Sequence, residues 1–235
     1  MARRPRLFIR NIPYHIIQRG NNRIPIFVRD EDYLFFLKVL KEAKAKHQCF
    51  IYSYCLMPNH FHLLVEPEKE ESSISLLIKL LGAKYVHYFN RSYNRSGTLW
   101  EGRFKCSLID KELYFLTCLL YIEMNPVRAG ILNSPEFYRW SSYRTRAFGE
   151  PNAILDLDPW YYGLGDNPEE RQVKYLHFFQ NVMPGHVLEF IRTTTNKNAI
   201  LGGINFKAHI EHLINKKIII RSVGRPKKGK IILTP

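Results

Sequence analysis

Residues 49–66 read CFIYSYCLMPNHFHLLVE, two apolar runs joined by the turn-forming residues 57–59. Runs rich in aromatic and β-branched residues, bounded by Pro and Asn, predict two strands that pair as a tight hairpin. Strand side chains alternate between two faces, so His60 and His62 should share one face while Phe61 points to the other. The stretch therefore predicts a hairpin that carries two neighbouring imidazoles on its outward face.

Neutral imidazole is a common metal ligand, and two imidazoles on a rigid strand need little reorganisation to chelate an ion. Two histidines on a half-exposed strand are nevertheless more often structural than metal-binding. The pair alone therefore leaves both interpretations open, and the rest of the chain has to decide between them.

The elements around the hairpin predict an α+β fold, with an antiparallel sheet and flanking helices. Helices alternate with strands, but the tight hairpin favours an α+β sandwich over a doubly wound parallel sheet. Asp110 is expected to cap a helix that runs to about residue 125 and stops at Pro126, and Ser72 or Ser73 to cap an earlier one. The expected strands cover residues 7–19, 49–57, 60–66 and 104–109, and the expected helices cover residues 30–47, 73–90 and 111–125.

The composition changes after residue 134 and predicts a second, mostly helical region. Residues 137–148 are aromatic and basic and are expected to be helical, and residues 149–167 are rich in Pro, Gly and Asp. Helical periodicity returns over residues 169–192 and 206–217. We therefore expect a catalytic domain at 1–148, a linker at 149–168 and a helical C-terminal region with a basic tail at 169–235.

The formal charge of +14 and the pI near 9.7 favour a polyanionic partner, nucleic acid first. The charge is concentrated at the two ends of the chain. Residues 1–29 contain seven arginines and no acidic residue, and residues 213–235 contain seven Lys or Arg and no acidic residue. A clustered distribution of this kind is typical of a surface that contacts backbone phosphates. An anionic membrane surface and a ribosome-like scaffold are the alternatives.

The four cysteines lie scattered in apolar stretches without a C-x-x-C motif, so we expect buried, reduced thiols and no zinc finger or disulfide scaffold. No apolar run approaches the roughly 18 residues that cross a bilayer. The basic start of the chain does not resemble a secretory signal. We therefore expect a cytoplasmic protein.

Tyr121 and Asn125 are spaced i, i+4 in the expected helix and should share one of its faces. A phenol is a poor nucleophile at neutral pH because its pKa is about 10. A divalent cation can hold a scissile phosphodiester in line with the phenol and neutralise charge in the transition state. Tyr121 would then form a covalent phosphotyrosyl intermediate. The amide oxygen of Asn125 could complete a His60-His62-Asn125 site for Mg²⁺ or Mn²⁺.

Three ordered motifs carry a resemblance to a known family. They are MPNHFHLLV at 57–65, WEGRFK at 100–105 and YIEMNPVRAG at 121–130. Together they resemble the HUH single-strand nucleases and, within these, the IS200-type single-tyrosine (Y1) transposases. Over residues 5–148 the chain is most similar to the REP-associated tyrosine transposases of bacteria.

The resemblance implies an RRM-like, ferredoxin-type core and a metal-dependent nuclease and strand transferase. By it, His60 and His62 are metal ligands, Tyr121 is the nucleophile that forms a 5'-phosphotyrosine, and Asn125 is the third protein ligand. Relatives from insertion sequences usually carry glutamine at the position of Asn125. The implied substrate is single-stranded or hairpin DNA of palindromic repeats, which places the protein at the bacterial nucleoid.

Several residues could contact the DNA outside the metal site. A loop after Gly20 and the WEGRFK motif combine basic and aromatic or amide side chains, which suit phosphate contact and base stacking. A hairpin turn and core packing are their structural alternatives. The Gly/Pro-containing basic tail at 224–230 resembles a minor-groove-binding segment, and a solvated tail is its alternative. The predicted DNA-binding residues are Arg19, Asn21, Arg23, Trp100, Arg103, Lys105, Arg225, Lys227 and Lys228.

Other assignments remain open at the level of sequence. Tyr114 lies seven residues before Tyr121, near the same helix face, and is the rival nucleophile. Glu123 is expected to face solvent or Arg128. His15 could line the site but is more readily explained as a packed core histidine.

Two other functions are consistent with the same basic surface. A non-catalytic, domesticated DNA-binding regulator of repetitive palindromic elements would keep the fold without the chemistry. An RNA-binding module would use the same basic and aromatic residues. The sequence is compatible with a homodimer and with a monomer.

Overall fold

The computed structural model describes residues 8–180 and 183–218 of the chain. Its strands are β1 (Tyr14–Arg19), β2 (Cys49–Met57), β3 (His60–Pro67), β4 (Lys105–Ile109) and β5 (Ile200–Leu201). Its helices are α1 (Asp30–His47), α2 (Ser73–Ser92), α3 (Lys111–Glu123), α4 (Asn125–Arg128), α5 (Tyr143–Phe148), α6 (Pro159–Tyr162), α7 (Pro168–Phe179), α8 (Gly185–Asn196) and α9 (Ile204–Leu213). Two 3₁₀ helices in the described loops are η1 (Asn21–Arg23) and η2 (Pro135–Phe137).

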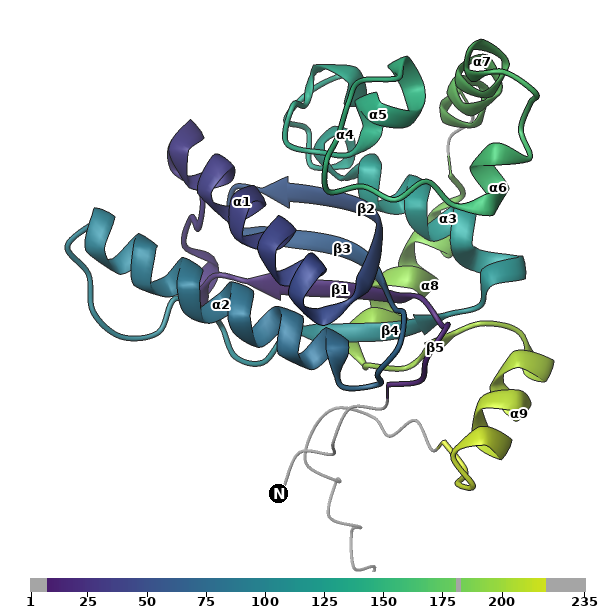
Figure 1. Ribbon diagram of the computed structural model, residues 1–235, viewed down its shortest axis with the longest axis horizontal. Helices are drawn as coiled ribbons and strands as arrows, with labels where there is room; N and C mark the ends of the chain where they lie inside the picture. The colour runs from purple at the N-terminus through teal and green to yellow at the C-terminus, as the bar shows by residue number, and fades with distance from the viewer. Residues whose placement is uncertain (1–7, 181–182, 219–235) are drawn as a thin grey trace, which may run out of the picture.

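The strands form one sheet in the order β2-β3-β1-β4-β5. The pairings among β1 to β4 are all antiparallel, and the short β5 pairs in parallel with β4. Helices α1 and α2 pack against each other on one face of the sheet, whereas α3 and α8 cover the other face (Figure 1). The β-α-β-β-α-β order with two helices on one face confirms the predicted α+β sandwich with an RRM-like core.

The β2–β3 hairpin forms as the sequence predicts, with Met57 opposite His60 and Cys55 opposite His62. β3 lies between β2 and β1 in the sheet, and helices pack against both of its faces. Phe61 points to the α1 side, where its ring lies 4.9 Å from that of Phe36. His62 points to the other side and is 3% exposed. The expected outward face is therefore interior, because α3 and α8 pack over it.

Acidic side chains begin two of the core helices. Asp32 lies in the first turn of α1 and accepts hydrogen bonds from the backbone N–H groups of Val28 and Arg29. Asp110 caps α3 as predicted, since its carboxylate accepts from the N–H groups of Glu112 and Leu113. These contacts satisfy donors that a helix leaves unpaired at its start. Ser72, one of the two predicted serines, occupies the N-cap position of α2, but its side chain makes no capping hydrogen bond.

The chain does not stop its helical path at Pro126. Helix α3 ends at Glu123, and after a single non-helical residue α4 begins, with the proline in its first turn. Proline is tolerated there because a first-turn residue needs no intrahelical N–H donor. The expected long strand is also shorter, because residues 8–13 lie outside β1.

Residues 137–148 are helical only in part, since η2 ends at Phe137 and α5 begins at Tyr143. The segment expected to be a linker contains α6 and lies against the edge of the sheet. There the Asp156 carboxylate accepts from the N–H of Ile51 and pairs with Lys44 at 2.7 Å. The helical pattern over 169–192 corresponds to two helices, α7 and α8, and the predicted last helix is α9. The predicted domain boundaries stay predictions.

The four cysteines are buried free thiols, as expected from their apolar surroundings. Among the residues that the structure describes, no helix combines the length and the apolar character that a membrane span requires.

A buried polar cluster fixes the end of α3 near its tyrosine. Glu123 is fully buried, so the expectation that it faces solvent or Arg128 is wrong. Its carboxylate accepts from the hydroxyls of Ser142 at 2.6 Å and Tyr175 at 2.5 Å. Arg146, also fully buried, lies 3.8 Å from Glu123 and 2.8 Å from Asp158. Burial raises the pKa of Glu123, and the Arg146 charge opposes that rise.

Replacing Arg146 by Met should lower the free energy of unfolding by about 3–5 kcal/mol, because two carboxylates stay buried without their cation. The loss should shrink as the pH falls from 7 toward 5. Loss of the cation raises the folded-state pKa of Glu123 further, so the folded protein then binds a proton more readily than the unfolded chain. Urea denaturation at several pH values measures both effects. In the matched variant Lys84→Met, the broken pair with Glu42 is half-exposed, and the loss should stay below about 1 kcal/mol.

Candidate active site

A cavity of about 680 Å³ lies between the sheet and the helices α3, α4 and α8. All four residues that were predicted from the sequence to be catalytic or metal-binding line it, namely His60, His62, Tyr121 and Asn125. Its charged lining consists of five basic residues and one acidic residue, so the cavity favours an anion such as a phosphodiester. The lining residues that bear on the chemistry are Arg19, His60, His62, Glu101, Arg103, Lys105, Tyr121, Asn125, Arg128, Arg192, Asn196 and Asn198.

His60 and His62 lie side by side on β3, with ring centroids 5.0 Å apart and rings at 72°. The Nδ1 of His60 lies 2.6 Å from the side-chain oxygen of Asn59. That amide oxygen only accepts, so Nδ1 carries the proton and Nε2 keeps its lone pair. The Nδ1 of His62 is paired with His15 at 2.8 Å. In both histidines Nε2 is therefore the ring nitrogen left for a ligand.

The three histidines of this face are neutral at physiological pH. Desolvation lowers the pKa of His15 to about 3 and that of His60 to about 4, with further lowering from nearby arginines. The pKa of His62 lies well below its usual value, because the ring is buried and has His60 and His15 beside it. Metal binding requires the neutral form of imidazole, so the site is prepared for it.

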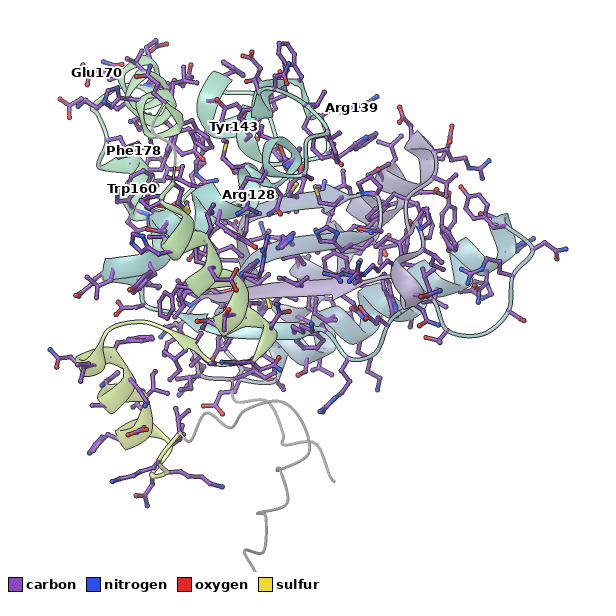
Figure 2. The ribbon with its side chains drawn as sticks, turned by 180° about the vertical axis from the view of Figure 1, so that it is seen from behind. Arg128, Arg139, Tyr143, Trp160, Glu170 and Phe178 are labelled. Atoms are coloured by element: carbon purple, nitrogen blue, oxygen red, sulfur yellow. The ribbon has the colours of Figure 1, made fainter. Side chains whose placement is uncertain are left out.

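Tyr121 projects from α3 into the same cavity. Its ring centroid lies 6.0 Å from that of His62 and 5.6 Å from that of His15, in both cases edge to face. The guanidinium carbon of Arg128 lies 3.7 Å from the centre of the Tyr121 ring. Figure 2 shows Arg128 on this side of the molecule, beside the sheet and α8. A fixed positive charge therefore lies directly beside the phenol.

Asn125 has a structural role in addition to the predicted one. Its side-chain NH₂ donates to the backbone carbonyls of Tyr121 at 3.0 Å and Ile122 at 3.2 Å. Pro126 has no N–H to offer the Ile122 carbonyl, so the Asn125 amide replaces the missing donor. With both carbonyls on the nitrogen side, the amide oxygen is the end that remains for a cation. The residue closes the helix and lines the cavity at once.

The donor set fits a hard or borderline divalent cation. Two neutral imidazole nitrogens and one amide oxygen suit Mn²⁺, or Mg²⁺ with additional water ligands. Within residues 8–180 and 183–218, no group of three or more His, Cys, Asp or Glu side chains is placed to hold a metal ion. Four amide side chains line the cavity, those of Gln18, Asn125, Asn196 and Asn198, and Asn125 is the one predicted to be a ligand.

The predicted DNA-contact residues divide into two groups. Arg19, Arg103 and Lys105 line the cavity, where Arg19 is 4.0 Å from Glu101 and Lys105 donates to Asn196 at 2.8 Å. Of the other predicted contacts that the structure describes, Asn21, Arg23 and Trp100 do not line the cavity. Asn21 and Arg23 are exposed in the turn η1, which follows β1 and is joined to Asn59 through the Arg23 carbonyl.

Trp100 lies on the opposite side of the sheet from the histidines. Its ring meets Phe61 edge to face at 5.9 Å and stacks on Tyr85 at 6.1 Å. Trp100 therefore packs against the core, which was the structural alternative to DNA contact. Its contact with DNA stays a prediction. The predicted contacts Arg225, Lys227 and Lys228 lie outside the described residues.

Tyr114, the rival nucleophile, does not line the cavity and instead packs beside Phe190. His15 is a buried core histidine, as expected, but it contacts a proposed metal ligand directly. The sequence analysis missed the cavity residues Arg128, Arg192, Asn196 and Asn198. Arg128 could have been found, because it lies seven residues after Tyr121 within the same motif. The other three belong to α8 and the residues after it, and no sequence pattern connects them with the histidines.

Fold and cavity together define an RRM-like α+β protein whose basic cavity contains histidines and a tyrosine. The family model described as "Transposase IS200 like" matches residues 8–125, half of the chain. The chain belongs to the IS200-like transposase family.

Individual proteins are also similar to this chain. A Haemophilus influenzae protein assigned as a REP-associated tyrosine transposase is 24% identical over 148 residues, which cover 59% of this chain and 80% of the relative. A solved REP-associated tyrosine transposase, bound to a REP hairpin, superposes with a TM-score of 0.51 and 18% identity over 67% of this chain and 93% of its own. This likeness extends the agreement to the fold. A transposase structure from Deinococcus radiodurans matches with a TM-score of 0.37 and 17% identity, over 55% of this chain and 92% of its own.

The structural role of Asn125 can be tested apart from metal binding. Asn125→Asp should lower the free energy of unfolding by about 1–3 kcal/mol, because a carboxylate cannot donate to the Tyr121 and Ile122 carbonyls. Urea denaturation in the absence of metal measures the change. Asn167→Asp is the matched control, since Asn167 uses its oxygen to cap α7 and Asp caps equally well. Equal stability of the two variants would contradict the capping role.

Proposed function

We propose that this protein is a metal-dependent, single-stranded DNA endonuclease and strand transferase that acts through a covalent phosphotyrosine at Tyr121. The observation that carries the proposal is the common position of four groups. His60, His62, Tyr121 and Asn125 come from β3, α3 and α4 and line a single basic cavity within one chain. Membership of a transposase family supports DNA as the substrate.

The reaction would be a transesterification at phosphorus. The Tyr121 oxygen attacks the scissile phosphate and forms a P–O bond to the phenol oxygen. The bond from phosphorus to the 3' oxygen of the preceding nucleotide breaks, and that oxygen leaves as a 3'-hydroxyl with a proton in place of the one lost by the phenol. The 5' phosphate stays joined to Tyr121, so the bond energy is kept for rejoining to another 3'-hydroxyl.

Cations of the cavity would orient the phosphate and balance charge during this exchange. Arg128 lies against the Tyr121 ring and can form two parallel hydrogen bonds to phosphate oxygens, which a lysine ammonium cannot. Arg192 and Lys105 line the same cavity and provide further positive charge. Such preorganised charge stabilises the transition state because it does not have to reorganise during the reaction.

His60 and His62 through Nε2, and Asn125 through its amide oxygen, would hold a Mg²⁺ or Mn²⁺ ion. When bound, the ion would act as a Lewis acid on a phosphate oxygen and help to fix the phosphate near the phenol. This arrangement gives the histidines a role in positioning the phosphate and no role in activating water.

The substrate we infer is single-stranded DNA next to a hairpin. One solved relative with the same fold is described as bound to a REP hairpin, and the +14 charge of this chain suits a nucleic acid. Arg19, Arg103 and Lys105 would contact the strand that enters the cavity, and Asn21 and Arg23 could contact it at η1. All four proposed catalytic and metal-binding groups belong to one chain, so a monomer would be sufficient for the first cleavage.

Tyr121→Phe should abolish the covalent adduct while leaving hairpin DNA binding intact, because only the attacking oxygen is removed. The assay incubates the protein with a labelled single strand that carries a palindromic-repeat hairpin and Mn²⁺ or Mg²⁺, and resolves adducts on a denaturing gel. Tyr114→Phe is the matched control and should form the adduct at the wild-type level. Chelation of the metal by EDTA should prevent adduct formation by the wild type.

An adduct with Tyr121→Phe, or its loss with Tyr114→Phe, would overturn the nucleophile assignment. Tight hairpin binding with no adduct in any protein or metal would instead indicate the non-catalytic DNA-binding regulator. Tighter binding of RNA than of the DNA hairpin would indicate the RNA-binding alternative.

Arg128→Met should lower the cleavage rate by about 10²–10³-fold, since it removes one preorganised cation from the transition state. Single-turnover measurement of adduct formation gives this rate. Arg139→Met is the matched control, because Arg139 also lies over an aromatic ring, 4.3 Å from the centre of Trp140, but does not line the cavity. Equal rates for the two variants would exclude a role for Arg128 in the reaction.

A further inference from the structure

A buried chain of hydrogen bonds connects the proposed metal ligand His62 to helix α8. The Nδ1 of His62 lies 2.8 Å from the Nε2 of His15, and the Nδ1 of His15 lies 3.1 Å from the hydroxyl of Thr195. The Thr195 hydroxyl lies 2.9 Å from the backbone carbonyl of Ile191 and 3.0 Å from the Ser107 hydroxyl. His15, Ser107, Ile191 and Thr195 are fully buried, so these hydrogen bonds are shielded from bulk water.

The Ile191 carbonyl determines which group donates and which accepts in each of these hydrogen bonds. A carbonyl oxygen only accepts, so at 2.9 Å the Thr195 hydroxyl must donate its single hydrogen to it. The Thr195 oxygen can then only accept, which makes both Ser107 and His15 donors toward it. His15 therefore carries its proton on Nδ1, and its Nε2 keeps a lone pair.

The same direction extends to His62. Because Nε2 of His15 accepts, Nδ1 of His62 must carry the proton and donate it. The lone pair of neutral His62 is then on Nε2, the nitrogen that the proposed metal site requires. We propose that Thr195, acting through His15, is a positioning residue that holds His62 in the tautomer able to bind a divalent cation.

The reverse direction would disable the site. If His15 carried its proton on Nε2, it would donate to His62, whose own proton would then be on Nε2 and would block a metal bond. That arrangement needs the Thr195 hydrogen at His15 and leaves two oxygens, those of Thr195 and Ile191, 2.9 Å apart with no hydrogen between them. The Ile191 carbonyl keeps its backbone bond within α8, so the cost of this direction is the lost hydroxyl bond and the repulsion between the two oxygens.

This inference rests on the proposed function for its metal but extends it to another part of the chain. The family model ends at residue 125, whereas Thr195 belongs to α8. Side chains that pair with the second nitrogen of a metal-binding histidine typically change metal affinity 10–100-fold when they are replaced. The C-terminal region would thus take part in metal binding without providing a ligand.

Thr195→Val keeps the shape of the side chain and removes the hydroxyl. The His15 and His62 tautomers should then no longer be fixed by the hydrogen bond to Thr195. Long-range ¹H–¹⁵N NMR of histidine-labelled, metal-free protein should show His62 protonated on Nδ1 in the wild type. The variant should show a mixture of tautomers or protonation on Nε2. Calorimetric titration with Mn²⁺ should show about 10–100-fold weaker binding by Thr195→Val.

Two further variants separate this role from simple packing. Thr195→Ser keeps the hydroxyl and should restore both the His62 tautomer and the Mn²⁺ affinity. Ser107→Ala removes a group that only donates to Thr195, so it should leave the tautomer unchanged even though it also alters the buried cluster. A shift of tautomer in Ser107→Ala as large as that in Thr195→Val would overturn the directional argument.

Different outcomes would overturn the positioning role of Thr195 and the proposed metal-dependent function. Equal tautomers and equal Mn²⁺ affinities in the wild type and Thr195→Val would overturn the positioning role while leaving the proposed function standing. Absence of Mn²⁺ and Mg²⁺ binding by the wild type would overturn the metal-dependent function and, with it, the role of Thr195 in metal binding.

Discussion

The site depends on the two-residue period of β3, a strand that is covered on both faces. Phe61 points to the α1 side of the sheet and contributes to the apolar core, while His60 and His62 are placed under α3 and α8. The His62 ring is buried and has no water to pair with, so its second nitrogen needs a protein partner, which is His15. His60 is half-buried, and its Nδ1 pairs with Asn59. These two pairings leave the Nε2 of each histidine for the cavity.

Helix α3 places Tyr121 between a basic cavity on one side and a buried cluster around the Glu123 carboxylate on another. On the cavity side the histidines are neutral and the charges are almost all cationic, a combination that favours an incoming phosphate. Two residues later, on another side of the helix, Glu123 is enclosed with Arg146 and the hydroxyls of Ser142 and Tyr175. The Arg146 charge lies there between the carboxylates of Glu123 and Asp158. The helix end is therefore fixed by polar contacts that lie away from the cavity.

Local rules were sufficient for much of the fold. The alternation in residues 49–66 gave the hairpin and the shared face of the histidines, and Asp110 marked the start of α3. Spacing on a helix and the family resemblance brought Tyr121 and Asn125 to the same cavity. These features depend on neighbours within one or two turns or on one adjacent strand.

The failures share a physical cause, because each depends on partners distant in the chain. Glu123 is buried by hydroxyls 19 and 52 residues away, and nothing near it in the sequence indicates that. The contact between His15 and Thr195 spans 180 residues. Trp100 is a further case, since the basic and aromatic composition of its motif does not reveal which face of the sheet its ring occupies.

The parallel pairing of β4 with β5 has a consequence for the order of events during translation. Ile109 of β4 pairs with Leu201 of β5. This pairing cannot form until the 92 residues after Ile109 have been synthesised. At synthesis rates of about 5–20 residues per second, that interval lasts about 5–20 s. A nascent chain that has reached residue 184 already contains both histidines and the tyrosine but not α8, which lines the cavity. The cavity is therefore complete only late in synthesis, long after its histidines and its tyrosine have been made.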